Sequence, residues 1–73
     1  VLNDIALLYY AQGRYQEAES SFERLRKILE EHAPDSAEMA ICLENYAAVL
    51  RRLDREQEST RLRARAKEIR DAL

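Results

Sequence analysis

The sequence predicts an all-α fold, in which four helices form two antiparallel hairpins, as in a fragment of an α-solenoid. Only one glycine and one proline occur among the 73 residues, which is too little turn chemistry for a sheet with several hairpins. Apolar residues recur at three- and four-residue spacing along the whole chain, as on amphipathic helices. The chain also matches itself when it is shifted by 41 residues, and an internal period of this size is typical of helical repeats.

Four helices are expected, and a local signal separates each from the next. Gly13 can adopt the left-handed conformation that ends a helix, and Pro34 disfavours a helical conformation at the residue before it. Asp54 tolerates the geometry of a second tight turn, and Asp35 with Glu38 resembles a capping box that starts the third helix. The expected helices cover 1–12, 15–31, 36–53 and 56–72. Because the turns at Gly13 and Asp54 are short, the helices that they join should be antiparallel neighbours.

Each expected helix carries an apolar stripe that should face the core. The stripes are Leu2, Ile5, Ala6 and Tyr9; Ala18, Phe22, Leu25 and Leu29; Met39, Leu43, Tyr46, Ala47 and Leu50; and Leu62, Ala66, Ile69 and Leu73.

The first hairpin carries a motif of large and small residues. Leu2, Ile5, Ala6 and Tyr9 are followed by Ala18 and Phe22, which gives large-x-x-large-small-x-x-large and then small-x-x-x-aromatic. This pattern resembles the tetratricopeptide repeat. The stretch LNDIALLYYAQGRYQEAESSFERL, with the inter-repeat segment Ala33-Pro34-Asp35, is similar to the long-period subtype found in kinesin light chains. The resemblance implies one domain over 1–73, with repeat one at 1–32 and repeat two at 36–73.

The second hairpin departs from this pattern. Ser59 and Arg63 stand where the first hairpin has Ala18 and Phe22. An arginine at the aromatic position implies that the outer face of the last helix is exposed to solvent, as in a terminal capping repeat. A bulky residue should therefore be tolerated better at Ser59 than at Ala18.

Charge and composition argue against several classes of function. The formal net charge is -2, so no overall field attracts nucleic acid or an anionic membrane. No apolar run approaches the ~20 residues that span a bilayer. Because Val1 opens directly into a helical pattern, no signal peptide is expected. The single cysteine, Cys42, permits no internal disulfide. We expect a cytoplasmic protein without a membrane partner.

Catalytic and metal chemistry has little support in the sequence. His32 is the only histidine and falls in an expected loop, and Cys42 has no neighbouring group that would activate its thiol. No cluster of ligands predicts a metal site, and no cofactor is expected. Arg63, Lys67 and Arg70 share a helical face, but acidic residues lie nearby and no aromatic residues interleave for base stacking. The sequence therefore argues against binding of nucleic acid by the last helix.

The resemblance implies a non-catalytic protein-interaction module or scaffold, because in this family the first helices of successive repeats line a concave groove for a peptide or a partner helix. Arg51 and Arg52 suggest a peptide with an acidic residue beside an apolar anchor, and at least one of them should face the same side as Tyr10. The family's two-carboxylate clamp is not expected, because Ile41, Glu44 and Ala48 do not supply its Lys and Asn. The groove-facing residues would be Asn3, Leu7, Tyr10, Ala11, Ile41, Glu44, Ala48, Arg51 and Arg52.

A second class of function is structural self-association. Without a preceding repeat, Val1, Leu8 and part of the second helix would expose apolar surface, which a symmetric homodimer would bury.

Overall fold

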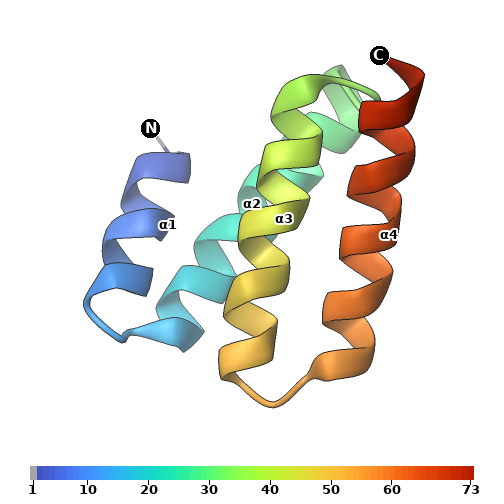
Figure 1. The fold of residues 1–73 in the computed structure, drawn as a ribbon. Helices are drawn as coiled ribbons and strands as arrows, with labels where there is room; N and C mark the ends of the chain where they lie inside the picture. Colours follow the sequence, from blue (N-terminus) through green and yellow to red (C-terminus); the bar gives the residue numbers. More distant parts are fainter. Residues whose placement is uncertain (1) are drawn as a thin grey trace.

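A computed structural model describes the backbone of residues 2–73 and the side chains from residue 3 onward. Within this range the chain forms four α-helices and no strand, namely α1 (Leu2–Ala11), α2 (Tyr15–His32), α3 (Ala37–Arg52) and α4 (Glu56–Ala72) (Figure 1). The all-α prediction is confirmed. The expected ends of the helices agree with the observed ends to within one residue, and the expected start at Val1 lies outside the described residues.

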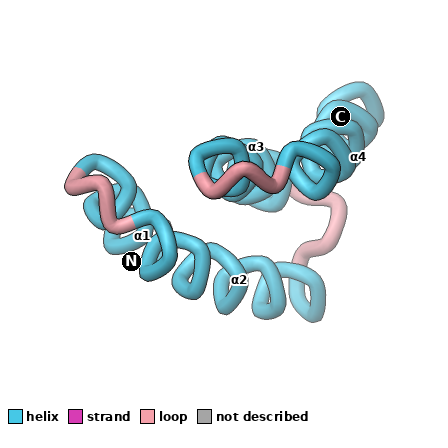
Figure 2. Tube along the Cα trace, turned by 90° about the horizontal axis from the view of Figure 1, so that it is seen from below, coloured by secondary structure: helices cyan, strands magenta, loops and turns pink. Residues whose placement is uncertain are grey.

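The helices pack consecutively as two antiparallel hairpins. In Figure 1, α1 and α3 both run downward, while α2 lies behind them. Seen from below in Figure 2, α3 lies between α1 and α4, and α2 runs beneath them along the lower edge of the view. The contacts follow this order, because α3 packs against both α2 and α4, whereas α1 packs chiefly against α2. The third helix is therefore the centre of the molecule.

Both hairpin turns have the same backbone design. Gly13 has a φ of +76° and Asp54 a φ of +60°. The N–H of Arg14 donates to the carbonyl of Tyr9 at 2.9 Å, and the N–H of Arg55 donates to the carbonyl of Leu50 at the same distance. A left-handed residue followed by this bond is the Schellman motif, which satisfies the free carbonyls at the end of a helix.

The start of α3 corrects one expectation from the sequence. The N-cap is Ser36, whose Oγ accepts from the backbone N–H of Met39 at 3.1 Å. The same hydroxyl donates to the carbonyl of Ala33 at 2.8 Å. The expected capping box at Asp35 and Glu38 is therefore wrong by one position. The extended backbone of Ser36 places the hydroxyl over the open N–H groups of the first turn.

The core lies on both sides of α3. The expected stripe of α3 is buried throughout, and Ala40, Cys42 and Val49 are buried in addition. These extra residues are covered because α3 faces α2 on one side and α4 on the other. The larger cluster joins both hairpins and contains Ala6, Ala18, Phe22, Cys42, Tyr46, Val49 and Leu50. The second cluster consists of Met39, Ala40, Leu43, Ala66 and Ile69.

Among the described side chains, which do not include that of Leu2, two stripe residues are exposed, contrary to expectation. The side chain of Ile5 is 44% exposed, because α1 has packed neighbours on one side only among the described helices. Leu73 is 73% exposed, because it follows the last turn of α4. Leu8 is 57% exposed, as the sequence predicts, whereas Val1 lies outside the described residues.

The position of Ser59 overturns the expectation that it lies at a tolerant site. Its side chain is 1% exposed, and its hydroxyl donates to the carbonyl of Ala47 at 2.9 Å. Ala47 is itself fully buried. The hydroxyl thus gives the Ala47 carbonyl a hydrogen-bond donor where α3 and α4 cross. Because this crossing is closely packed, it has no space for a larger side chain.

Candidate functional site

The first helices of the two hairpins enclose a hollow of about 320 Å³, which we call the α1–α3 hollow. Tyr10 contributes one wall from α1, and Ala48, Arg51 and Arg52 contribute the other from α3. Glu56, at the start of α4, closes one end. Four of the nine predicted groove residues therefore line this one hollow.

The polar groups of the hollow are arranged around Tyr10. The ring of Tyr10 packs edge-to-face on Tyr15 with 5.5 Å between the centroids. Arg52 Nε donates to the Tyr10 hydroxyl at 3.4 Å, whereas Arg51 Nε lies 3.5 Å from a carboxylate oxygen of Glu56. Both arginines thus face the same side as Tyr10, as predicted. Within the described side chains, Arg51 forms an ion pair and Arg52 does not.

The remaining predicted residues do not extend this hollow into one continuous groove. Asn3 and Ile41 line a separate hollow of about 200 Å³, together with Leu25, Leu29 and Glu38. Leu7 and Ala11 are exposed but line neither hollow. Tyr10 and Ile41 therefore line different hollows, and the expected apolar floor between them stays a prediction.

The register of the two helices explains this separation. α1 and α3 are parallel, and their contacts join residues 42 positions apart: Asn45 donates to Asn3 at 3.5 Å, and Arg52 donates to Tyr10. Tyr10 consequently lies beside Arg52 at one end of α3. Ile41 lies eleven residues away, or about 16 Å at 1.5 Å per residue.

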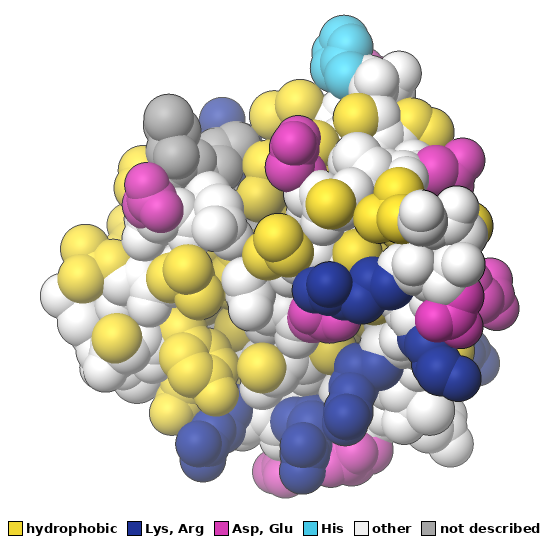
Figure 3. Space-filling view, turned by 45° about the horizontal axis from the view of Figure 1, so that its top comes forward, with side chains coloured by type: hydrophobic (Ala, Val, Ile, Leu, Met, Phe, Trp, Pro, Cys, Tyr) yellow, Lys and Arg dark blue, Asp and Glu magenta, His cyan; other side chains and the backbone are white. Residues whose placement is uncertain are grey.

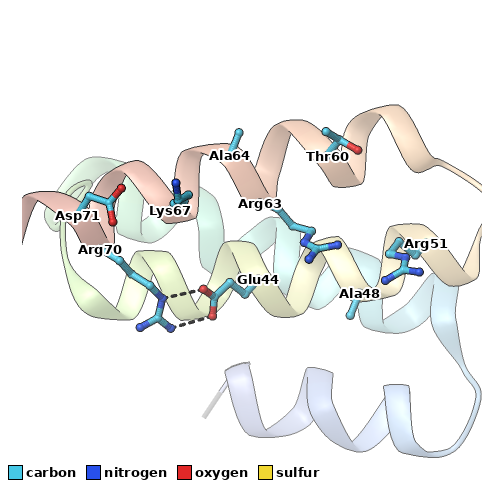
Figure 4. Close-up of a pocket in the computed structure, with 9 residues that line it drawn as sticks. All are labelled: Glu44, Ala48, Arg51, Thr60, Arg63, Ala64, Lys67, Arg70 and Asp71. Atoms are coloured by element: carbon cyan, nitrogen blue, oxygen red, sulfur yellow. Dashed lines mark hydrogen bonds and ion pairs between the residues drawn. The ribbon is translucent and has the colours of Figure 1, made fainter.

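A larger groove of about 740 Å³, which we call the α3–α4 groove, runs between the last two helices. The predicted residues Glu44, Ala48 and Arg51 form its α3 side (Figure 4). Arg70 crosses from α4 and forms two hydrogen bonds with the carboxylate of Glu44, at 2.6 and 2.7 Å. This ion pair lowers the pKa of Glu44 and raises that of Arg70.

The sequence analysis did not predict that α4 lines a groove. Thr60, Arg63 and Lys67 line it, and Arg63 projects toward α3 between Glu44 and Arg51 (Figure 4). The sequence indicates only that Arg63, Lys67 and Arg70 share a helical face. In Figure 3, basic side chains gather over α3 and α4 with acidic ones among them, while hydrophobic side chains gather toward α1.

The groups with potential for catalysis are placed apart. His32 is the last residue of α2 and is exposed, so its expected position in a loop is wrong by one residue. Cys42 is 1% exposed, its Sγ lies 3.8 Å from the carbonyl oxygen of Phe22, and burial raises its pKa to about 11. Such a thiol is a poor nucleophile at neutral pH. Among the described side chains, no three Cys, His or acidic residues are grouped so that they would hold a metal ion.

None of the described helices combines the length and the apolar character that a bilayer span requires.

Ion pairs connect the helices around the core. Glu23 on α2 accepts from the Tyr46 hydroxyl of α3 at 2.7 Å and pairs with Arg26 at 2.6 Å. Arg65 of α4 reaches Glu30 of α2 through two hydrogen bonds, at 2.8 and 2.6 Å. The Arg26 guanidinium is the main cause that lowers the pKa of Glu23, and the Arg65 guanidinium lowers that of Glu30.

We expect the stability of the chain to fall in acid, in part through Glu23. Because the folded state lowers the pKa of Glu23, its contribution is present above the unfolded pKa and is lost as the pH falls through the folded pKa. The melting temperature should therefore decrease below about pH 5. The variant Glu23→Gln should be less stable at neutral pH and should show a smaller decrease in acid.

The matched control for this measurement is Glu31→Gln, since Glu31 is an exposed α2 residue without an ion pair in the described structure. Thermal unfolding followed by circular dichroism at a series of pH values measures both variants. If Glu23→Gln and the unmodified chain have identical pH profiles, Glu23 does not contribute to the loss of stability in acid.

The fold and its surfaces define a helical-hairpin repeat protein. The chain belongs to the tetratricopeptide repeat family, since the model of that family matches residues 1–72. The motif of the first hairpin and the internal period thus identified the family correctly. No curated protein and no solved structure matches the chain.

Proposed function

We propose that this chain is a non-catalytic protein-interaction module, and that it binds a peptide segment of another protein in the α1–α3 hollow. Membership of the tetratricopeptide repeat family supports protein binding as the general role. The position of Arg52 supports the α1–α3 hollow as the place of binding. Arg52 lies beside the partly buried ring of Tyr10 and has no carboxylate partner among the described residues. The long-period subtype of kinesin light chains stays a prediction, supported by the 41-residue period.

The chemistry of the hollow favours an acidic peptide with an apolar anchor. The guanidinium of Arg52 offers a planar donor pair to a carboxylate. Tyr10 and Ala48 offer apolar contact at the same place. The hollow is short, so affinity should be weak, on the order of micromolar.

Two substitutions test this proposal. A library of peptides that combine acidic and apolar residues is titrated against the chain at low salt. For peptides that bind, Tyr10→Ala and Arg52→Glu should each weaken affinity about tenfold or more, which corresponds to about 1.4 kcal/mol. Arg24→Glu is the matched control and should have the smaller effect, because it makes the same charge change at an exposed position of α2 that does not line the hollow.

Equal affinity of all three variants for the selected peptides would overturn the assignment of the hollow. If no peptide binds at low salt, structural self-association becomes the better proposal.

Self-association has a specific observation in its favour. Ile5, Leu7, Leu8 and Ile28 are large hydrophobic residues that are between 39% and 57% exposed on the first hairpin. A homodimer that covers this surface should appear in sedimentation velocity at micromolar concentration, and Leu8→Glu should dissociate it. A cooperatively folded monomer at that concentration would contradict this role.

A further inference from the structure

The α3–α4 groove has an occupied counterpart within the same molecule. When its residues are shifted back by 41 positions, they fall on α1 and α2. On the α3 side, Glu44 and Arg51 correspond to Asn3 and Tyr10. On the α4 side, Arg63 and Ala64 correspond to Phe22 and Glu23.

The counterpart surface on the first hairpin is the one on which α3 packs. Asn3 accepts a hydrogen bond from Asn45, and the Tyr10 hydroxyl accepts one from Arg52, at 3.5 and 3.4 Å. The ring of Phe22 stacks on that of Tyr46 with 6.4 Å between centroids, and Glu23 accepts from the Tyr46 hydroxyl at 2.7 Å. A groove of this design in this chain therefore accepts one α-helix.

The α3–α4 groove differs from its counterpart in chemistry. Arg63 replaces Phe22, Arg70 replaces Leu29, and Lys67 replaces Arg26. The structure pairs Arg70 with Glu44, but Arg63 and Lys67 form no ion pair with the side chains of residues 3–73. An apolar helix laid over these two cations would remove them from water without compensation, which is unfavourable.

We propose that the α3–α4 groove binds an acidic amphipathic helix of a partner protein, with two carboxylates four residues apart that face Arg63 and Lys67. The spacing follows from the occupied counterpart, where the ring of Tyr46 stacks on Phe22, the counterpart of Arg63. The charge of Arg26, the counterpart of Lys67, acts on Cys42. Residues four apart lie on one helix face, so carboxylates at these two places meet the cations together. This surface shares Ala48 and Arg51 with the α1–α3 hollow but includes neither Tyr10 nor Arg52, which allows the two sites to be tested separately.

A second copy of the chain matches the groove less well. The 41-residue register places Ile5 of α1 at the position of Tyr46. Ile5 is exposed and apolar, so it offers no carboxylate to Arg63. Charge complementarity thus favours an acidic partner over self-docking.

A peptide derived from α3 is the probe. It comprises the segment from Ser36 to Leu53, which keeps the N-cap of the helix, with Cys42→Glu and Tyr46→Glu. A control peptide carries Cys42→Gln and Tyr46→Gln. The carboxylates exclude the acidic peptide from the apolar counterpart beside Phe22, because a charge would be buried there. Both peptides are fluorescently labelled and titrated against the full chain by anisotropy.

The acidic peptide should bind at least about tenfold more tightly than the control peptide, and its affinity should decrease as salt is added. The variant Arg63→Glu/Lys67→Glu should lose this preference. Arg24→Glu/Lys27→Glu changes the net charge equally on an exposed face of α2 and should bind the acidic peptide about fivefold or more tightly than the groove variant does. Tyr10→Ala should bind like the unmodified chain, which separates this site from the α1–α3 hollow.

Equal affinity for both peptides, or equal weakening by the two double variants, would overturn the proposal. The proposal would also be overturned if sedimentation velocity shows a homodimer that both Leu8→Glu and Arg63→Glu/Lys67→Glu dissociate. The occupant of the α3–α4 groove would then be a second copy of the chain. Circular dichroism of each variant verifies that the exposed substitutions leave the helices intact.

Discussion

Replacing Phe22 by alanine is expected to cost about 3–5 kcal/mol in the free energy of unfolding. Phe22 is fully buried in the cluster that joins both hairpins, and its ring stacks on Tyr46 of α3 at an interplanar angle of 18°. Removing the ring leaves a cavity between α2 and α3. A domain of this size has little stability to lose, so the variant should be largely unfolded at 37 °C.

Urea denaturation followed by circular dichroism measures this change. Ile28→Ala is the matched control, because Ile28 lies on the same helix but is 46% exposed. The control should lose well under half as much stability as Phe22→Ala. Similar losses for the two variants would mean that α2 does not join the hairpins through Phe22.

Leucine should be rejected at Ser59 as strongly as at Ala18. The two positions correspond under the 41-residue shift, and their side chains are 1% and 0% exposed. Overpacking a crossing of two helices costs about 1–3 kcal/mol. At Ser59 the substitution also removes the donor that the Ala47 carbonyl uses. This result reverses the expectation that the motif alone provides for the second hairpin.

The control for both positions is Ser20→Leu, which places the same side chain on an exposed position of α2. Its unfolding midpoint should stay close to that of the unmodified chain. A Ser59→Leu variant as stable as Ser20→Leu would show that α4 moves outward to accept the larger residue.

The two proposed binding surfaces share residues of α3. Ala48 and Arg51 line both the α1–α3 hollow and the α3–α4 groove. Arg51 pairs with Glu56 between them, so a ligand that recruits Arg51 on one side removes a neighbour from the other. Because α3 lies at the centre of the molecule, its residues Ala48 and Arg51 belong to both proposed surfaces.

The sequence alone determined the helices, their ends and the family. These features depend on local signals, such as the left-handed residues Gly13 and Asp54 and the restriction that Pro34 imposes on Ala33. They also depend on apolar spacing within one helix, which is why every predicted stripe residue of α3 is buried. The one-residue error at Ser36 arose because either of two adjacent polar residues is able to cap a helix.

The tertiary structure alone decided which surfaces exist. Cys42 and Val49 are buried because α3 has packed neighbours on two sides, whereas Ile5 is exposed because α1 has them on one. The parallel register of α1 and α3 placed Tyr10 and Ile41 in different hollows. Likewise, the pairing of Arg70 with Glu44 and of Arg51 with Glu56 left Arg52, Arg63 and Lys67 without carboxylates among the described residues. Ion pairs between helices depend on how the helices are placed, and no pattern within a single helix contains that information.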